Sequence, residues 1–72
     1  MALEATLNRD GIERLVLEAY PEGVYVLAFR PGEPGPFQDH LQDNWALAKQ
    51  QALLDYGVKP EDFREIPDLR IM

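Results

Sequence analysis

The sequence predicts an α+β fold: a three-stranded antiparallel β-meander with one α-helix packed on one face, followed by an irregular C-terminal tail. Three observations support this. Two glycine-ended turns divide the first thirty residues into segments rich in apolar residues, a Pro/Gly-rich loop follows them, and a helical apolar stripe comes after the loop. With 72 residues, we expect residues 1–72 to form a single domain.

The strands are predicted from the turns between them. Asn8-Arg9-Asp10-Gly11 and Tyr20-Pro21-Glu22-Gly23 both place glycine fourth, as in a type I turn closed by a left-handed residue. Such three-residue loops set Asn8 opposite Ile12 and Tyr20 opposite Val24. The predicted strands therefore span about 2–7, 12–20 and 24–30.

This register sorts the side chains onto two faces. The apolar face would hold Leu3, Ala5, Leu7, Leu15, Leu17, Ala19, Tyr25, Leu27 and Phe29. The other face would mix Glu4, Thr6, Arg14, Glu18 and Arg30 with Val16, Tyr20, Val24, Val26 and Ala28. A competing interpretation makes Ala2 to Leu7 a helical turn and uses Asp10 and Glu13 as the capping box of a following helix.

The second half of the chain is predicted as loop, helix and tail. Three prolines and two glycines between Pro31 and Phe37 exclude regular structure, so we expect a loop over 31–40. Asp43 is the predicted N-cap of a helix over about 43–56, which ends at Gly57. One stripe of that helix should lie on the sheet: Leu41, Trp45, Ala48, Ala52 and Tyr56.

Leu47 and Leu54 fall outside that stripe, so the helix carries more apolar surface than one sheet can cover. Within the tail, residues 57–72, we expect a short helical turn starting at Pro60. Beyond that turn the pattern leaves three alternatives open: the tail pairs as a further strand, folds over the helix, or stays mobile.

The helix region Trp45 to Val58, with its Ala-Lys-x-x-Ala spacing and aromatic-Gly-aliphatic ending, resembles small uncharacterised bacterial proteins built as a β-hairpin followed by one helix. The resemblance reaches back over the hairpin Leu15 to Phe29. It implies the fold and no activity.

Composition narrows the classes of function. Seven basic against thirteen acidic side chains give a net charge of −6, which disfavours nucleic acid and anionic lipid as partners. No apolar run approaches the ~20 residues of a membrane span. We therefore expect a soluble cytoplasmic protein. Cysteine is absent, so stability depends on packing, and a homo-oligomer such as a dimer is favoured for so short a chain.

Asp39, His40 and Asp43 are the one grouping with metal-ligand chemistry. His40 is the single histidine, however, and the cap explains Asp43, so we expect no bound metal and no cofactor. The chain holds neither serine nor cysteine, which argues against a nucleophilic enzyme and leaves no residue assigned as catalytic.

The sequence thus favours a non-enzymatic interaction module that self-associates. The predicted contact surface lies on the open sheet face or on the outer flank of the helix. Its candidate residues are Val16, Tyr20, Val24, Val26, Ala28, Leu47 and Leu54. Two alternatives stay open: a small metal-dependent or hydrolytic enzyme that uses Asp39, His40 and Asp43, and an adaptor or antitoxin-like protein that binds a basic partner.

Overall fold

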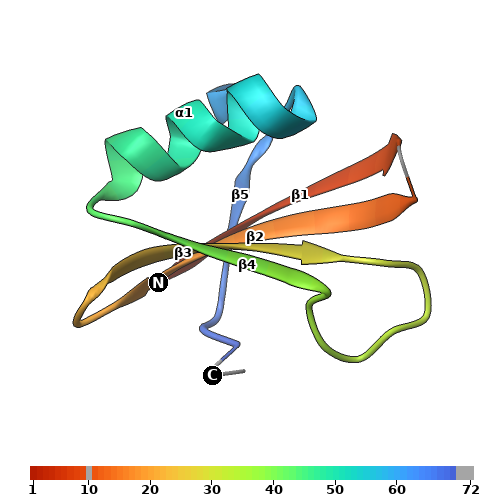
Figure 1. Ribbon diagram of the computed structural model, residues 1–72, viewed down its shortest axis with the longest axis horizontal. Helices are drawn as coiled ribbons and strands as arrows, with labels where there is room; N and C mark the ends of the chain where they lie inside the picture. Colours follow the sequence, from red (N-terminus) through yellow and green to blue (C-terminus); the bar gives the residue numbers. More distant parts are fainter. Residues whose placement is uncertain (10, 70–72) are drawn as a thin grey trace.

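The computed structural model describes residues 1–9 and 11–69. It confirms an α+β fold in which a single helix covers an antiparallel sheet, but the sheet has five strands instead of three (Figure 1). The strands are β1 (Ala2–Arg9), β2 (Ile12–Tyr20), β3 (Gly23–Phe29), β4 (Gln38–Gln42) and β5 (Arg64–Ile66). Their order across the sheet is β4-β3-β2-β1-β5, so β4 and β5 form the two edges.

The N-terminal half is extended, and the competing helical interpretation of residues 2–7 and of the segment after Gly11 is wrong. Leu3 pairs with Leu17 and Ala5 with Leu15, as predicted. Further along, the register shifts between Thr6 and Arg9, so that Arg9 and not Asn8 lies opposite Ile12. Asp10, which belongs to the predicted turn, lies outside the described residues.

The predicted register of the second hairpin is wrong by one residue. Tyr20 pairs with Gly23 and Leu17 with Val26, so the loop holds only Pro21 and Glu22. Because side chains alternate along a strand, this slip exchanges the two faces of β3. Leu27 and Phe29 therefore lie on the face opposite the one predicted, and Val24, Val26 and Ala28 take their places beneath the helix.

Helix α1 (Trp45–Tyr56) lies across one face of the sheet. Its N-cap is Asn44, not Asp43, because the Asn44 Oδ1 accepts a hydrogen bond of 2.9 Å from the Leu47 backbone N–H. Gly57 is left-handed and ends the helix, as predicted. The guanidinium of Arg9 lies against Gly57, where a cation is favoured by the helix dipole.

Two apolar clusters hold the layers together. Beneath α1, buried strand residues meet one stripe of the helix: Ala5, Ile12, Leu15, Leu17, Val24, Val26, Ala28, Ala48, Ala52, Tyr56 and Val58. Trp45 is half-buried against this cluster. On the opposite face, Ile66 and Leu69 pack on Ala2, Val16, Leu27 and Phe29. Each face of the sheet is therefore covered by a different part of the chain.

The last segment contains the short 3₁₀ helix Pro60–Asp62 and then β5. The 3₁₀ helix confirms the helical turn predicted at Pro60. β5 shows that, of the three alternatives for the tail, the tail pairs as a further strand. β5 pairs antiparallel with β1, with Ala2 opposite Ile66. After β5 the chain passes beneath the sheet on the side away from α1 (Figure 1). Residues 70–72 of the predicted tail lie outside the described part.

Candidate interaction surface

The residues proposed from the sequence as a contact surface fall into two groups. Val16, Val24, Val26 and Ala28 are buried inside the chain, so they offer almost no surface to a partner. The open sheet face that was expected does not exist, because the C-terminal segment covers it and the register slip moves three of these residues beneath α1. Tyr20 is half-buried against Tyr25, with ring centroids 5.2 Å apart.

The second group lies on the outer surface of α1. Leu54 is 73% exposed and Leu47 is 39% exposed. Leu53, on a third flank of the helix, is 45% exposed. The most outward positions of the helix are uncharged, and the exposed Asp55, which accepts a hydrogen bond from Gln51, borders them. These outward residues are Ala46, Leu47, Gln50, Leu53 and Leu54. We define Leu47 and Leu54 as the outer leucine pair.

The outer leucine pair is positioned by the contact between α1 and β4. Gln42, at the end of β4, donates a hydrogen bond of 2.6 Å from its Nε2 to the Gln51 Oε1. Leu47 precedes Gln51 by four positions and Leu54 follows it by three, so all three share one side of the helix. The outer leucines are therefore on the flank of α1 that adjoins the β4 edge.

Strand β4 itself was not predicted, and the expected loop over 31–40 is wrong from Gln38 onward. Gln38 to Leu41 are exposed, and Leu41, expected on the helix-to-sheet stripe, is 47% exposed. Val26 lies opposite His40 and Leu27 lies opposite Asp39. Gln38, His40 and Gln42 thus face the helix side, whereas Asp39 and Leu41 face the other side.

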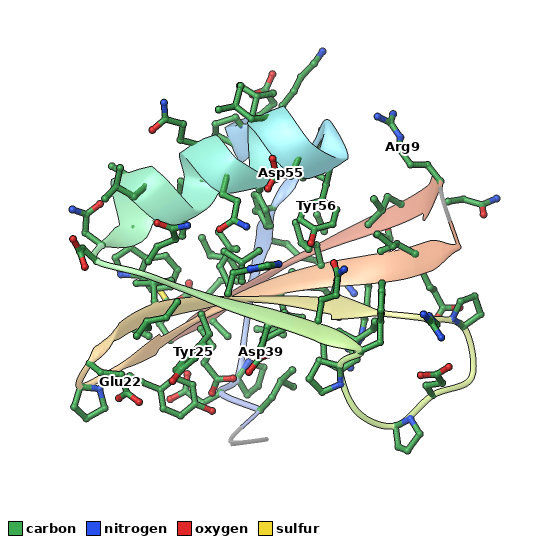
Figure 2. All side chains as sticks on the ribbon, viewed as in Figure 1. Arg9, Glu22, Tyr25, Asp39, Asp55 and Tyr56 are labelled. Atoms are coloured by element: carbon green, nitrogen blue, oxygen red, sulfur yellow. The ribbon has the colours of Figure 1, made fainter. Side chains whose placement is uncertain are left out.

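This alternation separates the candidate metal ligands. Asp39 points away from α1, toward the side where Tyr25 and Glu22 lie (Figure 2). His40 is on the opposite face, and Asp43 follows the strand. Across residues 1–9 and 11–69, no group of three or more His, Cys, Asp or Glu side chains is arranged to hold a metal ion. The structure thus does not bring the three together.

The electrostatic interactions are concentrated on the face away from α1. The buried carboxylate of Glu4 accepts hydrogen bonds of 2.7 Å from Arg14 Nη1 and 2.8 Å from Arg64 Nη2. These two guanidinium groups hold the pKa of Glu4 below its ordinary value. Arg14 also stacks over Phe29, at 4.2 Å from the ring centroid. The cluster ties β5, β1, β2 and β3 together.

Two tyrosines have raised pKa values for different reasons. The Tyr25 hydroxyl donates to Glu22 Oε2 at 3.1 Å, and this hydrogen bond to a carboxylate raises the pKa of the phenol. Burial beneath the helix raises the pKa of Tyr56, whose hydroxyl donates to Gln38 Oε1 at 2.9 Å. Both stay protonated donors near neutral pH, and Tyr56 thereby fastens the end of α1 to the start of β4.

A surface depression of about 470 Å³ lies near the β1–β2 turn, at the register shift that the sequence did not reveal. It is lined by Thr6, Leu7, Asn8, Glu13, Arg14 and Pro31. The Arg14 guanidinium at this depression is already paired with Glu4 and stacked on Phe29, so its charge is not free to bind an anion there. We assign it no ligand.

Comparison with protein-family models, with curated proteins and with solved structures found no match to this chain. The resemblance to small bacterial β-hairpin-plus-helix proteins therefore stays a prediction. In the described part of the chain, no helix has the length and apolar character needed to cross a membrane.

Proposed function

We propose that this chain is a non-catalytic interaction module that self-associates through the outer leucine pair of α1. The observation that carries the proposal is the exposure of Leu47 and Leu54 on a helix surface whose bordering charge, Asp55, is hydrogen-bonded to Gln51. Covering exposed leucine side chains with a second apolar surface removes them from water, which lowers the free energy of the system. A small chain without disulfides benefits most from such burial.

The net charge restricts where a second copy of the chain can bind. Each copy carries a net charge of −6, so two copies can approach closely only where the surface in contact is uncharged. The outward positions Leu47, Gln50 and Leu54 of α1 meet this condition, with Asp55 at their border. A basic partner, in contrast, would be attracted to acidic side chains that lie elsewhere on the surface.

The spacing of the leucines also suits contact between identical helices. Leu47 and Leu54 are seven residues apart, which is two helical turns. When two α1 helices pack antiparallel about a two-fold axis, Leu47 of each copy meets Leu54 of the other. We propose a dimer as the assembled form and the cytoplasm as its location; both proposals are based on the sequence.

The test measures molar mass in solution by size exclusion with light scattering. We expect the Leu47→Lys/Leu54→Lys double variant to shift the mass from a dimer toward the single chain. The double variant removes four leucine side chains from the dimer, two from each copy. At roughly 1.5 kcal/mol for each buried side chain, the dissociation constant should rise by about four orders of magnitude.

Leu53→Lys is the matched control, because Leu53 is an exposed leucine of the same helix but faces away from the Gln51 flank. It should keep the mass of the unmodified protein, and circular dichroism should show all three proteins folded. Equal masses for the double variant and the unmodified protein would refute the proposal.

A further inference from the structure

The two edges of the sheet differ in how they are protected. β5 has three residues, carries Arg64 and Glu65, and is followed directly by Pro67. Charges, prolines and short length all discourage an edge strand from pairing with another chain. β4 has five residues and no proline, and its one acidic side chain, Asp39, lies on the face away from α1. The backbone of β4 is therefore the open edge of this sheet.

The sequence of β4 is nearly symmetric about its centre. Gln38 and Gln42 lie two positions before and after His40, and these three side chains share the helix side of the sheet. Asp39 and Leu41 flank His40 on the other side. On the helix side, this strand presents the same row of side chains when a copy of itself is turned end to end beside it, whereas Asp39 and Leu41 break the symmetry on the other side.

We propose that two copies of this chain pair antiparallel through β4, with a two-fold axis at His40, so that one continuous sheet runs through both. This inference rests on the proposed self-association and specifies its geometry. It places His40 opposite His40 of the second copy and each Gln38 opposite a Gln42. Each Asp39 then lies opposite a Leu41.

Charge selects this register over its neighbours. A shift by two residues one way places Asp39 opposite Asp39 of the second copy, and a shift by two the other way places Asp39 opposite Asp43. Like charges directly opposite one another destabilise a strand pair. Shifts by one residue are excluded because they would pair side chains that point to opposite faces. The register centred on His40 keeps the carboxylates apart.

The same two-fold axis would also bring the outer leucine pairs of the two copies toward each other. A two-fold axis perpendicular to the sheet leaves both α1 helices on the same side, antiparallel to each other. The hydrogen bond from Gln42 to Gln51 marks the flank of α1 that adjoins β4, and Leu47 and Leu54 lie beside Gln51 on that flank. Strand pairing below and leucine contact above thus belong to one interface.

A charge exchange at His40 tests the register. In the His40→Lys protein two ammonium groups would face each other, and in the His40→Glu protein two carboxylates would. We expect each variant alone to have a dissociation constant at least about ten-fold above that of the unmodified protein, and an equimolar mixture to form a one-to-one complex. Native mass spectrometry distinguishes the mixed dimer from both homodimers, and its formation shows that both variants are folded.

The control is Glu65→Lys, which places a lysine on the other edge strand and should leave the dimer unchanged. Dimers of His40→Lys and His40→Glu as tight as the unmodified dimer would overturn the β4 register, and so would variants that stay monomeric when mixed. If the leucine double variant dissociates while these His40 results fail, the β4 pairing is wrong and the leucine contact stands. A monomeric unmodified protein would refute both proposals.

Discussion

Glu4 shows how one buried charge is stabilised in this small sheet. Its carboxylate is bonded to Arg14 and Arg64, residues that come from β2 and β5. The pKa of Glu4 is lowered from 4.5 by these hydrogen bonds, the one from Arg64 first. A carboxyl whose pKa is lower in the folded state contributes stability above its unfolded value, and that stability is lost as the pH falls through the folded value.

We therefore predict that Glu4→Gln lowers the free energy of unfolding by about 1.5 kcal/mol at pH 7, a modest value because Arg64 is mostly solvent-exposed. The difference from the unmodified protein should shrink below pH 4.5, as Glu4 becomes protonated. Urea denaturation at several pH values measures both effects. Glu61→Gln, at an exposed position, is the control; an equal loss in both variants at pH 7 would contradict this role for Glu4.

At the scale of elements, Gly23 explains why the second hairpin was assigned the wrong register. Its position after Tyr-Pro-Glu suits the last residue of a three-residue loop, but in the structure it is the first residue of β3. Gly23 has a φ of 151°, and a Cβ there would meet the backbone oxygen of Gln42. The glycine is required by the close approach of β4, a strand that the sequence did not reveal.

Gly23→Ala should accordingly lower the free energy of unfolding by at least about 2 kcal/mol, from backbone strain and from the clash with β4. Gly35→Ala is the control, because open space surrounds that position. Thermal unfolding followed by circular dichroism compares the two variants. Equal melting temperatures for both would show that β4 does not approach Gly23 as described.

The elements that the sequence predicts correctly are those marked by residues close to one another in the chain. The strands β1 and β2 follow from apolar residues between two turns, and the end of α1 follows from Gly57. β4 was missed because Gln-Asp-His-Leu-Gln contains no β-branched or aromatic residue, so the pairing with β3 alone makes it a strand. Asp43 and Asn44 are equally good caps by residue type, and only the geometry decides between them.

At the scale of the whole molecule, the sequence predicted apolar surface left over after folding but not its location. The one-residue slip of β3 and the C-terminal segment together bury Val16, Val24, Val26 and Ala28. Val16 is covered by Ile66 and Leu69, fifty or more positions away, and Val24, Val26 and Ala28 are covered by α1. Local patterns in the sequence do not report such distant contacts. The helix flank of Leu47 and Leu54 needed only the period of the helix, and the structure leaves both exposed.

The most direct test of this account is sedimentation equilibrium of the unmodified chain over a range of concentrations. We predict a mass of twice the single-chain value of 8.2 kDa at the higher concentrations, with reversible dissociation on dilution. A mass of one chain at every concentration would contradict the proposed self-association.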